Sequence, residues 1–85
     1  MHNEHENLMA ALDHAIVLRT SWVRHKPRKR GGRTIKLCEG TTVGLRQRSG
    51  SWWQIAYHDP FTDRIEDGWM FECLLEKVGW VRGFE

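Results

Sequence analysis

The stretch Gly50-Ser51-Trp52-Trp53-Gln54-Ile55-Ala56-Tyr57 decides the fold class of this chain. The glycine and serine at its start are typical of a hairpin turn, and the residues after them are rich in aromatic and β-branched types, which favour strands. Because side chains alternate between the two faces of a strand, Trp53, Ile55 and Tyr57 are expected on the inward face. Trp52 is then expected to point outward. The stretch therefore predicts one half-buried strand of a sheet.

Similar short pieces, separated by glycine and proline, extend on both sides of this strand. The 85 residues are enough for one domain only. Short strands at roughly ten-residue spacing predict an all-β fold, either a small barrel or a sandwich. The expected strands are 15–23, 34–37, 42–47, 52–57 and 68–71, with one more strand or a packed tail in 77–85.

The remaining segments complete the expected organisation. Apolar residues at helical spacing predict a short N-terminal helical segment within 1–14. By composition, 24–33 and 58–67 are loops and 72–75 is a single helical turn. We therefore expect a polar N-terminal segment (1–14), a barrel (15–76) and a C-terminal tail or extra strand (77–85).

Four motifs, in this order, resemble those of the bacterial Src-homology-3-like (SH3b) domain. They are Trp22-Val23-Arg24-His25-Lys26-Pro27, then Ile35-Lys36-Leu37-Cys38-Glu39-Gly40-Thr41-Thr42-Val43, then Gly50 to Tyr57, and finally Gly68-Trp69-Met70 with Cys73-Leu74-Leu75. The resemblance covers most of the chain. It implies a small SH3-like β-barrel of five to six short strands.

Three features depart from the family pattern. The loop after Pro27 is strongly basic where family members usually carry Ser, Thr and Gly, the segment 60–67 is an insertion, and the tail after Leu75 is extra. Secreted members of the family often bind cell-wall peptides or glycans. The polar, acidic N-terminus does not have the pattern of a signal peptide, so that role is disfavoured.

The charge distribution draws attention to one loop. The net charge is only +2, but residues 19–36 carry every basic residue of the N-terminal half and no acid. These are Arg19, Arg24, Lys26, Arg28, Lys29, Arg30, Arg33 and Lys36. Such a block is either a solvated loop or a functional basic patch, and composition leaves both readings open.

The five tryptophans exceed what a core of this size needs, so some are expected at the surface as contacts. An aromatic groove formed by Trp22, Trp52, Tyr57 and Trp69 is the first candidate site. The expected core consists of Val23, Ile35, Leu37, Val43, Leu45, Trp53, Ile55, Trp69 and Leu74.

These observations predict a non-enzymatic binding module, a stand-alone adaptor or inhibitor that engages a protein partner through the basic loop and exposed aromatics. The alternative is a nucleic-acid-binding protein that uses the same loop on phosphates. The candidate partner-binding residues are Trp22, Arg24, Lys26, Arg28, Lys29, Arg30, Arg33, Trp52 and Tyr57.

Other chemistry is not indicated. No nucleophile, acid–base or phosphate-cradling pattern stands in a supporting context, so we expect neither catalytic residues nor a cofactor. His2, Glu4, His5 and Glu6 lie in a flexible terminus by composition, which does not predict a metal site. Cys38 and Cys73 are expected to be free thiols in the cytoplasm, and no apolar run is long enough for a membrane span. The oligomeric state is left open.

Overall fold

The computed structural model describes residues 13–78, which form an all-β domain of seven strands. A single 3-10 turn, η1 (Glu72–Leu74), precedes the last strand. The strands are β1 (Asp13–Val17), β2 (Ser21–Arg24), β3 (Arg33–Leu37), β4 (Thr42–Ser49), β5 (Trp52–Asp59), β6 (Arg64–Phe71) and β7 (Leu75–Val78). The predicted fold class is confirmed, and the predicted count of five to six strands is wrong. No helix that could cross a bilayer occurs within residues 13–78.

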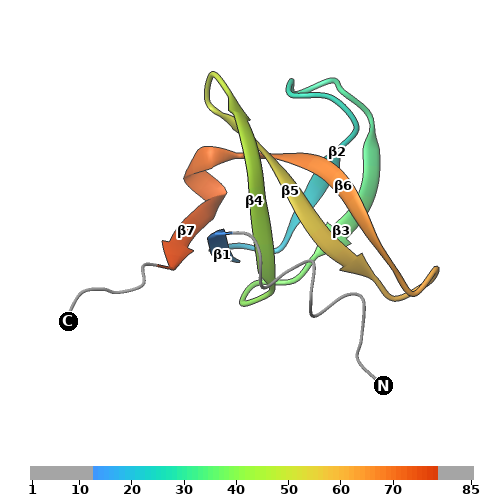
Figure 1. Ribbon diagram of the computed structural model, residues 1–85. Helices are drawn as coiled ribbons and strands as arrows, with labels where there is room; N and C mark the ends of the chain where they lie inside the picture. Colours follow the sequence, from blue (N-terminus) through green and yellow to red (C-terminus); the bar gives the residue numbers. More distant parts are fainter. Residues whose placement is uncertain (1–12, 79–85) are drawn as a thin grey trace, which may run out of the picture.

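All seven strands belong to one antiparallel sheet, in the order β3-β2-β6-β5-β4-β1-β7. Figure 1 shows the long strands β4, β5 and β6 crossing the centre, with β2 and β3 curling round one side. Within the described residues β3 and β7 are the two edges of the sheet. The sheet is strongly curved, and no strand pairing within residues 13–78 closes it.

The centre of the sheet consists of two hairpins, β4–β5 and β5–β6. Gly50 lies in the left-handed region with a φ of 60° and reverses the chain between β4 and β5. Asp63, with a φ of 56°, does the same before β6. A bulge in β4 falls between Leu45 and Gln47, where the register with β5 shifts by one residue. Bulges of this kind bend a strand, which suits the curvature.

Several predicted boundaries need correction. The segment 15–23 contains two strands, β1 and β2, joined by an exposed turn at 18–20. Residues 64–67, predicted to be loop, pair with β5 because only 60–63 are needed to reverse the chain. Their side chains are mostly polar, so the sequence shows no apolar alternation that would predict a strand there. At the C-terminal end β7 pairs with β1 and crosses the expected boundary at residue 76.

The predicted N-terminal helical segment is contradicted where the structure describes it. Asp13 and His14 are the first residues of β1, with His14 paired to Gly44 of β4 and to Val78 of β7. Their neighbours on both sides are strands, so extended backbone satisfies their hydrogen bonds. The rest of that prediction, residues 1–12, lies outside the described residues.

The core lies on the concave face and is aliphatic. Val23, Leu37, Val43, Leu45 and Ile55 are buried as predicted. Ile35, Trp53 and Leu74 are only partly buried and pack against its rim. The core also includes Ala15, Val17 and Met70, which the prediction missed, and Tyr57, which was expected on the inward face but not counted among the core residues.

Trp69 does not belong to the core, which corrects the prediction. It alternates with Met70 on β6, and Met70 is the fully buried one of the two. Gly68, on the same face as Met70, is also buried, and a Cβ there would clash with Cγ1 of Val23. The Gly-Trp pair of β6 therefore lets β2 approach closely, while its tryptophan faces outward.

Candidate functional site

An aromatic groove of about 430 Å³ opens on the convex face of the sheet. We define it by its apolar lining, Trp22, Trp52, Phe71 and Leu74. Thr20, Ser21, Arg24 and Lys29 complete its walls. The lining comes from the turn at 18–20, β2, the β2–β3 loop, β5, β6 and η1, so the groove exists only in the folded sheet.

Trp52 and Phe71 form the part of the groove fixed most directly by the sheet. They lie opposite each other on β5 and β6. Their ring centroids are 5.1 Å apart in an edge-to-face arrangement, the geometry that aromatic pairs prefer. As predicted, Trp52 faces away from the core, and Trp53 packs against it.

Trp22 carries two cations on its ring. The guanidinium carbon of Arg33 lies 5.2 Å from the ring centroid, and Nζ of Lys36 lies 5.4 Å from it. Both distances are within the range of a cation–π interaction. Lys36 pairs with Trp22 across β2 and β3, so the contact follows from the strand register.

The β2–β3 loop (25–32) is shaped by its own backbone hydrogen bonds. Arg28 N–H donates to Lys26 O at 2.7 Å, Gly31 N–H donates to Arg28 O at 2.9 Å, and His25 N–H donates to Gly32 O at 3.1 Å. Gly31 is required here, because a Cβ would lie 2.5 Å from Lys26 O. The predicted basic loop is therefore a folded turn rather than an open chain.

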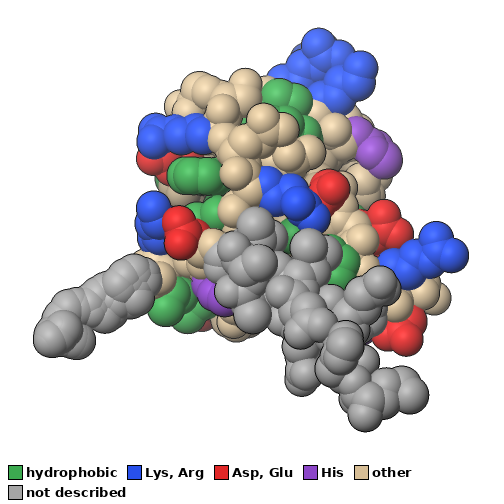
Figure 2. All heavy atoms as spheres, viewed as in Figure 1, with side chains coloured by type: hydrophobic (Ala, Val, Ile, Leu, Met, Phe, Trp, Pro, Cys, Tyr) green, Lys and Arg blue, Asp and Glu red, His purple; other side chains and the backbone are tan. Residues whose placement is uncertain are grey.

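No ion pair within residues 13–78 compensates the basic side chains of this loop. The ion pairs between described residues join Arg46 to Asp67, Arg48 to Glu72 and His58 to Asp63. None of them involves the exposed Lys26, Arg28, Lys29 or Arg30. Figure 2 shows blue side chains projecting at the top, where the β2–β3 loop lies in Figure 1, whereas other blue groups on this face have red neighbours.

Not every predicted contact residue reaches the groove. Arg24 and Lys29 line it, Arg33 contacts Trp22, and the exposed Lys26, Arg28 and Arg30 remain on the loop beside it. Trp69 is half-buried on the same face, in register with Gln54 and Arg24, but does not line the groove.

Tyr57 is a correction to the predicted site. It is 3% exposed and packs in the core, because it lies on the same face of β5 as Ile55. Its hydroxyl oxygen lies 3.4 Å from Oγ1 of Thr34, at hydrogen-bond distance. Burial raises the pKa of Tyr57 above its ordinary value, and nearby carboxylates add to this shift. The residue is structural rather than a contact.

Two groove residues, Phe71 and Leu74, were missed by the sequence reasoning. Phe71 follows Trp69 by two positions, so strand alternation could have placed it on the same outward face. The sequence gives no comparable indication for Leu74, because this residue lies in the 3-10 turn η1, where strand alternation does not apply.

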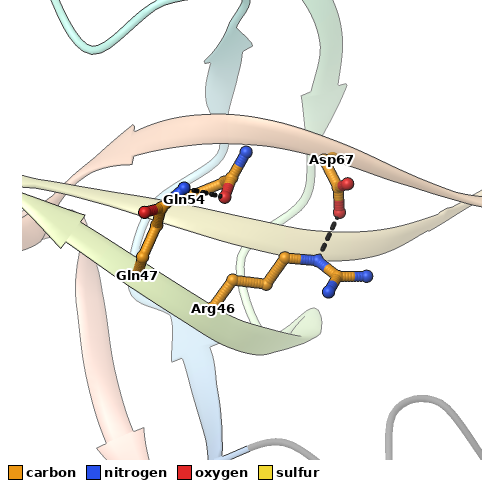
Figure 3. Close-up of polar contacts among 4 residues, drawn as sticks. All are labelled: Arg46, Gln47, Gln54 and Asp67. Atoms are coloured by element: carbon orange, nitrogen blue, oxygen red, sulfur yellow. Dashed lines mark hydrogen bonds and ion pairs between the residues drawn. The ribbon is translucent and has the colours of Figure 1, made fainter.

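A polar row continues the same face beyond the aromatic residues (Figure 3). Nε2 of Gln47 donates to Oε1 of Gln54 at 2.7 Å, and Nε of Arg46 donates to Oδ1 of Asp67 at 2.5 Å. The pair with Arg46 compensates the charge of Asp67. The convex face therefore changes from aromatic and basic at Trp52 to polar and neutralised along β4, β5 and β6.

Metal and thiol chemistry have little support in the described residues. Within 13–78 no three His, Cys, Asp or Glu side chains gather closely enough to hold a metal ion. The histidines and acids considered at the N-terminus lie outside this range. Cys38 and Cys73 are both free and exposed.

Comparison with known proteins adds no relative. No protein-family model, no curated protein and no solved structure matches this chain.

Proposed function

We propose that this domain is a non-enzymatic binding module that takes an acidic segment of a partner protein in the aromatic groove. The observation that supports this most is the combination of Trp52, Phe71 and Trp22 with Arg24 and Lys29 on the same groove, two cations that form no ion pair with another described residue. Among residues 13–78, no His, Cys, Asp or Glu lines the groove. This composition suits recognition better than acid–base or nucleophilic chemistry.

Aromatic anchors and charge play different parts in this proposal. Aromatic side chains dominate interface energies, so an apolar side chain of the partner is expected between Trp22 and Trp52. The basic loop steers an acidic surface toward the groove and accelerates association. Because the loop is folded by its own hydrogen bonds, little ordering cost is expected on binding.

The resemblance to SH3b domains supports a related proposal about the fold. The curved sheet of short antiparallel strands is compatible with an SH3-like barrel, and the four motifs occur on its strands and turns. We also place the module in the cytoplasm, because two exposed free thiols suit a reducing compartment.

Single-stranded nucleic acid is the second candidate ligand. The observation that favours it is the pair of cations on Trp22, since a base could stack on the groove aromatics while Arg33 and Lys36 contact phosphates. A protein partner is preferred, because acids are numerous on the rest of the chain and the overall charge is only +2.

A titration at several salt concentrations separates the two candidates. The probes are a blocked peptide with the sequence EELEEWEE and an oligonucleotide of ten thymidines. We expect the peptide to bind, and Trp52→Ala to weaken it about tenfold or more. Neutralising Arg28, Lys29 and Arg30 to Gln should mainly slow association. The control is Arg64→Gln, an exposed cation on β6 outside the groove lining.

A different result would favour nucleic acid over a protein segment as the ligand of the groove. In that case the oligonucleotide binds and the peptide does not, and the log–log salt slope falls by about 0.7 for each phosphate contact that the triple variant removes. If neither probe binds, both readings of the groove are wrong.

A further inference from the structure

The outer edge of β3 is a second surface beside the aromatic groove, which it adjoins where Arg33 and Lys36 lie over Trp22. β3 ends the sheet on one side, and β2 is its only strand partner among residues 13–78. Its other edge therefore presents backbone N–H and C=O groups that have no strand partner within residues 13–78. Both neighbours of β3 in the chain, the β2–β3 loop and the turn at 38–41, are described.

An apolar hollow of about 380 Å³ lies along this strand. Ile35, Leu37, Pro60 and Phe61 give it most of its apolar lining, the last two from the β5–β6 turn. Phe61 is 88% exposed, the most exposed large hydrophobic side chain within 13–78. Its backbone N–H donates to Oδ1 of Asp59 at 2.8 Å, so the turn holds the residue in place. Phe61 is continuous with the apolar lining of the hollow, and contiguous exposed apolar patches are typical of interaction surfaces.

The two faces of β3 differ in character. Arg33 and Lys36 are exposed and lie over Trp22. Ile35 and Leu37 face the core side and line the hollow, and Lys36 reaches the rim of the hollow from the strand edge. The strand contains no acid, and no ion pair between described residues involves its two cations.

We propose that this edge binds an extended segment of a partner protein as an added strand, with acidic side chains alternating with apolar ones. Strand addition supplies main-chain hydrogen bonds, and alternate side chains reach opposite faces of the extended sheet. The apolar residues of the segment would lie over Ile35 and Phe61. Its acids would lie on the face of Arg33 and Lys36, where opposite charges on neighbouring strands are favourable.

Charge complementarity selects this occupant over a second copy of the chain. Pairing β3 with β3 of another molecule would bring four cations together on one face, which is unfavourable. Basic side chains on an edge strand are a known means of preventing such self-pairing. The same charges attract an acidic strand.

The test is a nuclear magnetic resonance titration of the full chain with a blocked peptide of sequence EVEVEVE. We expect shift changes and slowed hydrogen exchange at the amides of β3, with shift changes at Phe61. A peptide with the same side chains and methylated backbone amides should not bind, because it cannot form the ladder. KVKVKVK should not bind either. Phe61→Ser, at a position 88% exposed, should weaken EVEVEVE about tenfold without unfolding the protein.

A charge reversal makes the test specific. Arg33→Glu with Lys36→Glu should exchange the preference from EVEVEVE to KVKVKVK, whereas Lys77→Glu on the opposite edge strand should not. Trp52→Ala should leave EVEVEVE binding at β3 unchanged, so this surface can fail independently of the aromatic groove. The proposal is overturned if the methylated peptide binds equally well, if the changes map to Trp52 and Phe71, if β3 pairs in a homodimer, or if no peptide binds.

Discussion

The indole of Trp52 and the phenyl ring of Phe71 lie with centroids 5.1 Å apart and planes inclined at 61°. The two residues are direct partners across β5 and β6, in a ladder that runs without interruption to Asp59 and Arg64. The eight paired positions therefore hold the two rings in place. One wall of the groove is formed before any ligand arrives, which lowers the cost of binding.

The edge-to-face contact predicts a measurable coupling between these two rings. In a double-mutant cycle of Trp52→Ala and Phe71→Ala, we expect a coupling free energy of about 0.5–1.5 kcal/mol in unfolding by urea. The control cycle pairs Trp52→Ala with Phe61→Ala, since Phe61 follows the far end of β5. Equal coupling in the two cycles would show that the rings do not interact.

Adjacent residues on β6 should differ in their effect on stability. Met70 is fully buried, so Met70→Ala should lower the free energy of unfolding by about 2–5 kcal/mol. Trp69→Ala, on the convex face, should cost less despite removing a larger side chain. Urea denaturation of both variants checks this order. The opposite order would return Trp69 to the core.

Gly68 is expected to tolerate no side chain. Its added methyl group would meet Val23, so Gly68→Ala should destabilise the domain by about 1–3 kcal/mol, as overpacking does. Gly50→Asn is the matched control, because that position is open and Asn accepts a positive φ. Thermal melts measure both. A wild-type melting temperature for Gly68→Ala would mean that β2 does not pack closely on β6.

The stability of the domain should fall in alkaline solution through Tyr57. Its pKa is raised above the ordinary value of 10.0 by burial, so the unfolded chain ionises first as the pH rises. The contribution is complete below pH 10 and is lost progressively above it. Because Tyr57 is the sole tyrosine, absorbance at alkaline pH follows it directly.

The control for this experiment is Tyr57→Phe, which removes the phenol and leaves every lysine in place. Between about pH 9 and 11 the wild-type free energy of unfolding should decline more steeply than that of the variant. Parallel declines would indicate that the hydroxyl is ionised equally easily in the folded and unfolded chains.

The sequence predicted strands best where side chains alternate and a glycine marks the turn. The segment 52–57 and the turn at Gly50 are correct for this reason. Residues 64–67 were missed, because a polar strand has no apolar periodicity and only its partner β5 reveals it. The same applies to β7, which is a strand because β1 offers it an edge.

The site was predicted in part. Trp22, Arg24, Lys29 and Trp52 do line one groove, since the alternation and the charge block are local signals. Alternation correctly placed Tyr57 on the inward face, but it was wrongly chosen as a contact as well, because a phenol is equally suited to a surface contact and to a core with one hydrogen-bond partner. Phe71 and Leu74 depend on which strands become neighbours, and that information is not local.

The hydrogen bond from His25 N–H to Gly32 O fastens the base of the β2–β3 loop. Beyond this fastening, the six residues from Lys26 to Gly31 form no part of the sheet. Their length and charge can therefore vary without disturbing the pairing of β2 with β3, since loop closure depends only weakly on length. The β2–β3 loop could therefore be replaced by another sequence to change the binding specificity, while the strands keep their pairing.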